Sequence, residues 1–366
     1  MSRVQAAWPV IAPVLGVLVL GATWGRHIQP VVVVVVAVVL AFAVLAAVQH
    51  AELIAHKIGE PFGSLVLAVA VTVIEVALIV TLMASGGKNS ESLARDTVFA
   101  AVMITTNGIV GLSLLAASRR FGTSRFHAEG TGAALATVVS LATLSLVLPT
   151  FTSSASGPRF SSAQLAFAAV MSLALYGFFV LTQTVRHRDF FLPVSSREGS
   201  SHEPLDEDEH ADPPTAREAW TSLVMLLLGL VAVVGLAKVE SPSIEAGVKA
   251  VGFPPTFVGV VIALLVLLPE TLAAFRAANR DRVQISLNLA YGSAMASIGL
   301  TIPAIAVASL WLEGPLLLGL GAVQIVLLAL TVVVSILTVV PGRATRLQGA
   351  VHLVLLAAFV FLSISP

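Results

Sequence analysis

The stretch GEPFGSLVLAVAVTVIEVALIVTLMASG, residues 59–86, carries one carboxylate, Glu75, close to the middle of a long apolar run. Between Pro61 and Ala84 there is no Lys, Arg, Asp or other Glu. A helix of that length, rising about 1.5 Å per residue, crosses the roughly 30 Å hydrocarbon core of a bilayer. An ionised carboxylate at that depth costs about 2–4 kcal/mol even on lenient insertion scales, so Glu75 is a candidate functional residue.

The composition of the whole chain indicates an all-α integral membrane protein whose surroundings are a lipid bilayer. Of the 366 residues, 57% are hydrophobic and 11% are charged, whereas soluble chains carry about 25% charged residues. A membrane β-barrel would show alternating segments of about ten residues, and the sequence has none. The zero net charge gives no indication of a nucleic-acid partner, and the absence of Cys excludes disulfides and thiolate metal sites.

Apolar runs predict about eleven transmembrane helices, interrupted by one long hydrophilic segment. The predicted spans are 8–25, 30–50, 61–84, 96–117, 130–150, 161–186, 219–238, 255–277, 283–311, 315–340 and 347–364. We therefore divide the chain into a leading helix (1–29), a first half (30–186), an acidic loop (187–218) and a second half (219–366). The loop is rich in Ser and Pro, carries the acidic run Asp206–Glu209, and has the composition of a disordered linker.

Basic residues predict the orientation in the membrane. With these spans, fourteen Lys and Arg residues fall on the side of the N-terminus and six on the other side. We expect a multi-pass protein of the cell (inner) membrane. Because loops rich in Lys and Arg stay in the cytoplasm, the N-terminus and the acidic loop should be cytoplasmic and the C-terminus external.

The two halves contain related segments. A shift of 195 positions places Glu75 on Glu270 and Phe62 on Phe257. The predicted span of Glu75 starts inside, whereas that of Glu270 starts outside, so the halves form two inverted five-helix repeats, the plan of secondary transporters with a midplane ion site. The predicted ion-binding segments are 59–117 and 254–304. Pro269 frees a carbonyl oxygen one turn before Glu270, and such oxygens are ligands that Ca²⁺ prefers.

Three motifs and one residue pair resemble a known family. They are GEPFGSLVLAVAVTVIEVAL (59–78), the Arg95–Asp96 pair, LLPETLAAFRAA (267–278) and NLAYGSAMASIGLTIP (288–303). With the acidic loop between the halves, the chain resembles the calcium/proton antiporters of the cation/calcium exchanger superfamily, bacterial ChaA type. The resemblance implies that Glu75 and Glu270 bind the cation and exchange it for protons. Relatives often have Gly-Ser where this chain has Ala101–Val102, and some have Gln at Ala296, so the number of ligands stays open.

The predicted cation- and proton-binding residues surround this pair of glutamates. They are Glu75, Glu270, Thr105, Thr106, Asn107, Asn288, Gly292 and Ser293, with the two glutamates as the metal ligands. For Asn107, Asn288 and Ser293, helix–helix hydrogen bonds are as good an explanation as contact with an ion. Gln324 is expected to serve packing, and His352 is expected at the membrane interface. His50, Glu52, His56 and Glu60 indicate either a solvated helix end or a proton relay.

The sequence therefore predicts a secondary active transporter and not an enzyme, with no cofactor. Glu75 and Glu270 would bind Ca²⁺ or protons in competition, by alternating access. A Na⁺(K⁺)/H⁺ antiporter on the same fold and a cation channel stay open as alternatives. An intramembrane metalloprotease is excluded because no H-E-x-x-H motif exists. The oligomeric state is not predicted.

Overall fold

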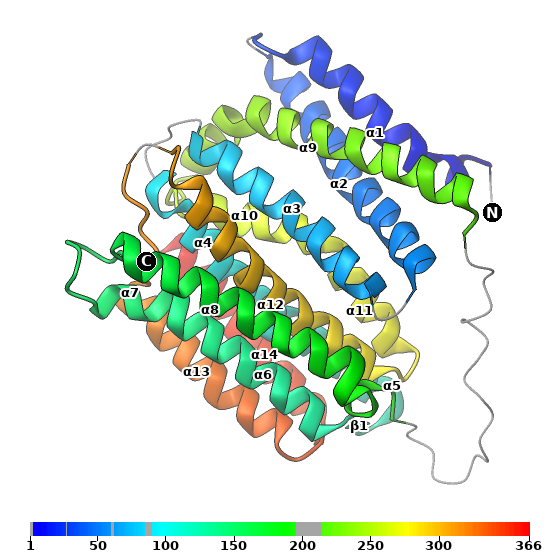
Figure 1. Ribbon diagram of the computed structural model, residues 1–366, viewed down its shortest axis with the longest axis vertical. Helices are drawn as coiled ribbons and strands as arrows, with labels where there is room; N and C mark the ends of the chain where they lie inside the picture. Colours follow the sequence, from blue (N-terminus) through cyan, green and yellow to red (C-terminus); the bar gives the residue numbers. More distant parts are fainter. Residues whose placement is uncertain (1–2, 27, 60–61, 85–89, 195–213, 313) are drawn as a thin grey trace.

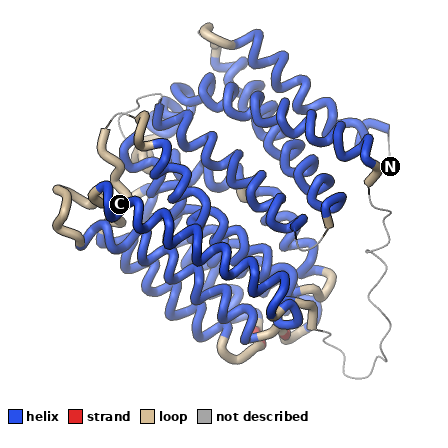
Figure 2. The backbone as a smooth tube through the Cα atoms, viewed as in Figure 1, coloured by secondary structure: helices blue, strands red, loops and turns tan. Residues whose placement is uncertain are grey.

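The molecule is built almost entirely of helices (Figures 1 and 2). Our computed structural model describes residues 3–26, 28–59, 62–84, 90–194, 214–312 and 314–366. The helices are α1 (Arg3–Thr23), α2 (Pro30–Ile58), α3 (Phe62–Ala84), α4 (Ser90–Met103), η1 (Ile104–Ile109), α5 (Val110–Phe121), α6 (Ala128–Ala142), η2 (Thr143–Val147), α7 (Leu148–Phe151), α8 (Ser162–Leu181), η3 (Thr182–Arg186), η4 (Arg188–Phe191), α9 (Ala216–Ala250), α10 (Phe257–Val266), α11 (Leu268–Asn279), α12 (Val283–Ala308), α13 (Ala322–Val339) and α14 (Arg346–Ile364). The predicted acidic run 206–209 and Glu60 lie outside the described residues.

These helices confirm the prediction of an all-α, multi-pass membrane protein. In the described part of the chain, eight helical segments are long and apolar enough to cross a membrane. The α10–α11 pair forms a ninth segment that is bent by 54°, and two shorter apolar helices cover Ala7–Thr23 and Val69–Ala84. Each of the eleven predicted spans has one of these segments as its counterpart.

Three predicted boundaries are wrong: the helices predicted to end at 50 and 238 continue to Ile58 and Ala250, and one helix starts later than predicted. The span predicted at 315–340 becomes helical only at Ala322. The preceding backbone instead donates hydrogen bonds to other segments, from Leu317 N to Glu91 O and from Leu320 N to Leu146 O. Gln324 therefore lies in the first turn of α13 and not at mid-span. Its Oε1 accepts from Gly321 N at 2.9 Å, which caps the start of that helix.

The helices form two bundles that meet along α3. In Figure 1, α1, α2 and α9 lie together on one side of α3, and the larger group with α6, α8, α12, α13 and α14 lies on the other. Each bundle has its own apolar core: the smaller one joins residues of α2, α3, α9 and α10, and the larger one is centred on α4, α5, α6 and α12. The α3 helix and the bent α10–α11 segment therefore lie at the boundary between the bundles.

Local signals fix how helices begin and connect. At the start of α9, the Thr215 hydroxyl accepts from Glu218 N while the Glu218 carboxylate accepts from Thr215 N, a capping box. The short strands β1 (Ser124–Arg125) and β2 (Arg343–Ala344) pair antiparallel. They join the connection after α5 to the connection before α14.

Candidate functional site

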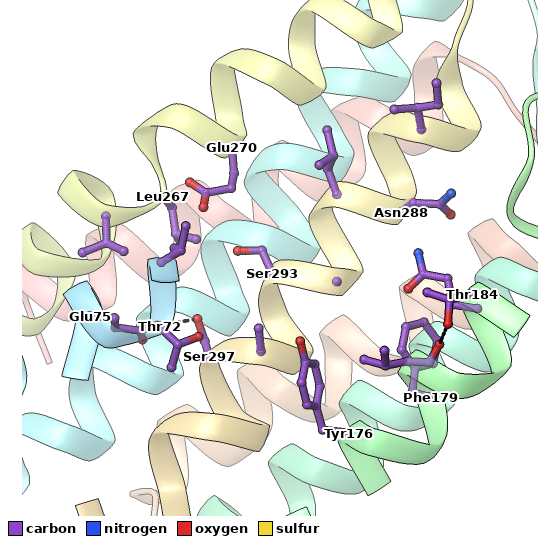
Figure 3. A pocket seen from close by; sticks show the side chains of 18 residues that line it. Thr72, Glu75, Tyr176, Phe179, Thr184, Leu267, Glu270, Asn288, Ser293 and Ser297 are labelled. Carbon is purple, nitrogen blue, oxygen red and sulfur yellow. Dashed lines mark hydrogen bonds between the residues drawn. The ribbon is translucent and has the colours of Figure 1, made fainter. Parts of the chain in front are cut away.

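A cavity of about 230 Å³ lies where the two bundles meet and contains both predicted glutamates. Figure 3 shows the carboxylates of Glu75 and Glu270 and the hydroxyl of Ser293 around one space. The lining residues come from α3, α8, η3, the α10–α11 break and α12. They are Val71, Thr72, Glu75, Tyr176, Phe179, Val180, Gln183, Thr184, Val266, Leu267, Glu270, Ile285, Asn288, Leu289, Gly292, Ser293, Ala296 and Ser297.

Glu75 is held in the continuous helix α3. Its side chain is 2% exposed, and Oε2 accepts a hydrogen bond of 2.9 Å from the Ser297 hydroxyl of α12. Its other oxygen, Oε1, is buried and has no hydrogen-bond partner among the described residues. A buried carboxylate of this kind needs a proton or a cation to neutralise it. The Glu75 carboxylate is thus positioned with one oxygen left to bind a ligand.

Glu270 lies in the first turn of α11, directly after the 54° break. Pro269 has no backbone N–H, so a regular helix cannot continue through this position. The break turns the start of α11 into the cavity, where Glu270 is close enough to Glu75 for the two charges to repel. Its Oε2 is buried and has no hydrogen-bond partner in the described part of the chain. The structure therefore brings two incompletely satisfied carboxylates to one cavity.

Small residues of α12 make room for the cavity and for the helix beside it. Gly292, Ser293, Ala296 and Ser297 recur at helical spacing, so they line one face of α12. Further along, a Cβ on Gly299 would lie 2.8 Å from the Cβ of Tyr176. Glycine at this position is required for the close approach of α8, which brings aromatic side chains to the cavity.

Five of the eight predicted binding residues line the cavity, and three do not. The five are Glu75, Glu270, Asn288, Gly292 and Ser293. Thr105 and Thr106 lie in η1 and donate back to the chain, to Ala101 O at 2.7 Å and Val102 O at 2.6 Å respectively. The Asn107 side chain is hydrogen-bonded to Thr331 of α13 and His352 of α14. In this conformation the polar residues of η1 therefore do not reach the cavity.

Asn288 makes helix–helix hydrogen bonds although it borders the cavity. Its Nδ2 donates to Phe191 O at 2.7 Å, and its Oδ1 accepts from Gln284 Nε2 at 2.9 Å. These bonds fix η4 against α12. Phe191 is buried and packs edge-on against Phe179, with ring centroids 5.7 Å apart. Asn288 thus connects the wall of the cavity to the segment that leads into the acidic loop.

Sequence reasoning missed several residues that line the cavity. Thr72 precedes Glu75 by three positions and so faces the same way on α3, a spacing that could have identified it. Ser297 follows Ser293 by four positions and shares its face of α12. Tyr176, Gln183 and Thr184 had no such signal, because their position depends on how α8, which η3 continues, packs against α12.

The Arg95–Asp96 pair lies outside the cavity. Arg95 donates to Asp96 Oδ1 at 2.8 Å and to the carbonyl oxygen of Gly319, while Ser92 donates to Asp96 Oδ2 at 2.9 Å. A Cβ on Gly259 would lie 2.8 Å from the Asp96 backbone. The pair therefore joins α4 to the extended segment before α13, at the point where α10 crosses α4.

His352 corrects an expectation. It was predicted at the membrane interface, but its side chain is fully buried between α13, α14 and η1. The α14 span begins at Arg346, so His352 already lies within the packed bundle. There the ring is hydrogen-bonded on both nitrogens.

The cavity offers few charged ligands. No group of three or more His, Asp and Glu side chains that could hold a metal ion comes together among the described residues. Any cation in the cavity would be held by the two carboxylates together with neutral oxygens such as those of Thr72, Ser293 and Ser297. Such a site supplies two negative charges and hard oxygen ligands.

Known proteins similar to this chain are named as ion transporters. The chain matches the family model described as "Sodium/calcium exchanger protein" over residues 28–185 and 221–365. It is 42% identical, over 98% of its length and 96% of the relative's, to a candidate ionic transporter, y4hA of Sinorhizobium fredii (strain NBRC 101917 / NGR234). It is 35% identical, over 96% of its length and 94% of the relative's, to the sodium-potassium/proton antiporter ChaA of Escherichia coli (strain K12).

A solved structure shares the fold at low identity. The Ca²⁺/H⁺ antiporter protein YfkE matches with a TM-score of 0.67 at 13% identity, and the match covers 100% of both chains.

Proposed function

This chain belongs to the sodium/calcium exchanger protein family, as its motifs predicted, and on that premise we propose that it is a cation/proton antiporter with Glu75 and Glu270 as its binding carboxylates. The observation that carries the proposal is the shared cavity, in which both glutamates have a buried oxygen with no partner among the described residues. These oxygens have no protein donor among the described residues, so they are available to a proton or a cation. The proposed exchange of protons for a cation needs no covalent chemistry.

Competition for the same oxygens couples the two fluxes. Two neighbouring carboxylates in an apolar cavity cannot both stay charged without compensation. Either protons neutralise them, or a cation binds between them and replaces the protons. The two negative charges cannot be neutralised twice over, so a cation that binds must displace protons, and each passage of the cation in one direction returns protons in the other.

The cavity supports access from one end of the molecule. Its lining runs along α12 from Ser297 to Ile285 and reaches Gln183 and Thr184, close to where η3 ends and α12 begins. The predicted orientation places that end in the cytoplasm. On the other side of Glu75, α3 presents Leu78, Ile79 and Leu82, which are buried in the apolar cores. We assign this conformation to the inward-facing state of an alternating-access cycle.

Charge balance favours Ca²⁺ as the exported cation. Two carboxylates match one divalent ion, and Ca²⁺ accepts carboxylate, hydroxyl and carbonyl oxygens together. The carbonyl of Leu265, one turn before Pro269, lacks the N–H of that proline as a donor and is a further candidate ligand. The structural relative YfkE is named a Ca²⁺/H⁺ antiporter, which supports this assignment.

Exchange of Na⁺ or K⁺ for protons is the second candidate, and two observations favour it. The relative ChaA, 35% identical, is named a sodium-potassium/proton antiporter. In addition, η1 contributes no side chain to the cavity, and Ala296 lines it where some relatives have Gln, so few neutral ligands surround the carboxylates. One monovalent ion together with one retained proton would also balance the two charges.

Ion flux in proteoliposomes tests the proposal. Purified protein is reconstituted into vesicles that contain a pH-sensitive dye, and Ca²⁺, Na⁺ or K⁺ is added in turn against an outward or inward proton gradient. We expect Ca²⁺ to drive proton movement in the opposite direction, and an imposed proton gradient to drive ⁴⁵Ca²⁺ uptake.

Each other outcome has a defined meaning. Robust Na⁺- or K⁺-driven proton release without proton-driven Ca²⁺ uptake would overturn the calcium assignment in favour of the second candidate. Cation current that needs no proton counter-flux would identify a channel and contradict antiport altogether.

A further inference from the structure

A second buried polar cluster lies outside the cavity and connects the first half of the chain to its last two helices. We call it the η1 network; its members are Asn107 of η1, Thr331 and Thr338 of α13, and His352 of α14. All four side chains are buried, with exposed fractions between 0% and 3%. In an apolar bundle, polar groups that are so deeply buried must satisfy one another.

The hydrogen bonds of the η1 network are complete for one neutral form of the histidine. Asn107 Nδ2 donates to Thr331 Oγ1 at 3.0 Å, and the Thr331 hydroxyl in turn donates to Met103 Sδ at 3.7 Å. Asn107 Oδ1 lies 3.2 Å from His352 Nδ1, and His352 Nε2 lies 3.1 Å from Thr338 Oγ1. With the proton on Nδ1, His352 donates to Asn107 and accepts from Thr338.

Glycines bring α14 close enough for these bonds. A Cβ on Gly111 would lie 3.0 Å from Gly349 O and 3.1 Å from the Cβ of His352. A Cβ on Gly349 would lie 2.7 Å from the backbone nitrogen of Leu115. The crossing of α5 and α14 is therefore a backbone-to-backbone contact at two glycines, and it places His352 directly beside η1.

The segment that His352 holds is irregular. The η1 turn is π-helical, and Val110 N is bonded to both Thr105 O and Asn107 O, so it bypasses the intervening Thr106 O. A π-helical turn is less favourable than a regular α-helical turn and persists where side chains support it. Asn107 and His352 supply that support.

The irregular turn is next to the candidate ion site. On the side away from α13 and α14, η1 packs against α11 and α12, the helices that carry Glu270 and Ser297. The hydroxyls of Thr105 and Thr106 point back to the carbonyls of the preceding turn. A change in the η1 turn would therefore move both the packing of α11 and α12 and the direction of these hydroxyls.

We propose that His352 is a positioning residue of the antiporter: through Asn107 it holds the π-helical turn of η1 against α11 and α12, and so sets the geometry from which the glutamate site changes access. The inference rests on the proposed function. It assigns to the last helix a part in transport that the cavity alone does not reveal, because none of the η1 network lines the cavity.

A matched pair of amide substitutions separates the two bonds of the ring. The amide nitrogen of Asn occupies nearly the position of histidine Nδ1, whereas that of Gln occupies nearly the position of Nε2. His352→Asn keeps the contact with Asn107 and loses the contact with Thr338. His352→Gln does the reverse. We expect His352→Asn to keep at least about half of the turnover and His352→Gln to lose about tenfold, since a buried Asn107 oxygen is left unpaired.

The measurement is the initial rate of cation-driven proton flux in proteoliposomes at several cation concentrations, together with the melting temperature of each purified variant. We expect the two variants to have equal melting temperatures. The KM for the cation should stay within about twofold of wild type in both, because the cavity is untouched, so the two variants should differ only in turnover. Equal turnover of the two variants, at any level, would overturn the proposal, as would a change confined to KM.

A double-mutant cycle on folding tests the contact without any transport assay. The melting temperatures of Asn107→Ala, His352→Ala and the double variant should be non-additive, with the double variant close to the worse single one. Additive losses would overturn the contact. If the wild-type protein shows no exchange while the cycle is non-additive, the proposed function fails and the contact stands, so the two failures are distinguishable.

Discussion

The two glutamates of the cavity occupy different surroundings although the sequence presents them as equivalent. Glu75 lies in the middle of a continuous helix, is buried, and is held by Ser297 of the other half of the chain. Glu270 follows a 54° break and lies in the first turn of a new helix, partly exposed in the cavity. The carboxylate of α3 is therefore fixed, and the carboxylate of α11 is the one that can be reoriented.

The spans that follow the two glutamate helices also differ in regularity, but in the opposite order. After Glu75, the next span contains the π-helical turn η1, whereas after Glu270 the next span, α12, is regular across the cavity. Each half thus has one regular and one irregular helix, in exchanged order. An irregular helix has a backbone that can rearrange, so we infer that the movable parts are α11 in one half and η1 in the other.

Removal of either charge should have the largest effect. Glu75→Gln and Glu270→Gln should each lower cation-driven proton flux by about a hundredfold or more, because removal of one charge from a buried ionic contact costs about 2–5 kcal/mol. The measurement is dye-reported flux in proteoliposomes, with the melting temperature as a control for folding. Near-normal exchange in either variant would reduce that glutamate to a packing residue and remove the basis of the comparison.

Restoration of a backbone donor at the break should have the next largest effect. Pro269→Ala supplies an N–H for the carbonyl of Leu265, which favours a straighter α10–α11 segment and moves Glu270 relative to Glu75. We expect turnover to fall by about tenfold. Pro303→Ala, at the other proline inside a cavity-lining helix but beyond the cavity, is the matched control and should leave flux within about twofold of wild type. Equal effects of the two substitutions would show that the break at Glu270 has no special role.

Loss of the hydroxyl that holds Glu75 should have a smaller effect. Ser297→Ala removes the donor 2.9 Å from Glu75 Oε2, and the KM for the cation should change by about three- to tenfold, as expected for a hydrogen bond to a charged group. Gly292→Ala, one turn earlier with open space at its Cβ position, is a matched small change in the same cavity wall. If the two substitutions shift KM equally, Ser297 does not position Glu75.

Carboxylates outside the membrane should matter least. Replacement of the acidic run 206–209 by Ser and Gly should leave basal flux within about twofold of wild type, since the run lies outside the predicted apolar spans and carries none of the predicted binding residues. Complete loss of exchange in a well-expressed variant would place the loop in the transport path.

Orientation can be tested independently of activity. The chain has no native Cys, and Thr123 and Ser154 are both exposed. From intact cells, an impermeant thiol reagent should label Ser154→Cys and not Thr123→Cys. The reverse pattern would invert the predicted topology and, with it, the side to which the cavity gives access.

The sequence predicts the spans and the glutamates because both depend on local signals. An apolar run long enough to cross a bilayer is readable at every position, and a lone carboxylate in such a run stands out. The break at Glu270 was also readable, because Pro269 removes a hydrogen bond whatever the neighbours are.

The residues that the sequence misplaced depend on packing between distant segments. Asn107 could have faced either the ion or another helix, and it faces α13 and α14 because Gly111 and Gly349 allow α14 to approach. His352 is central for the same reason. The start of α13 shifted to Ala322 because the preceding backbone pairs with three other segments. None of these partners is apparent in the local sequence, since each is more than a hundred residues away along the chain.

The most direct test of the central claim is to count the protons released when a cation binds to the purified protein. In weakly buffered solution, Ca²⁺ is added while binding and pH are recorded together, for wild type and for the double variant Glu75→Gln/Glu270→Gln. Competition for the two carboxylates predicts proton release that saturates with Ca²⁺ binding, at most one proton per glutamate, and none in the double variant. Calcium binding without proton release, or release that persists in the double variant, would contradict the claim that these two glutamates bind cation and protons in turn.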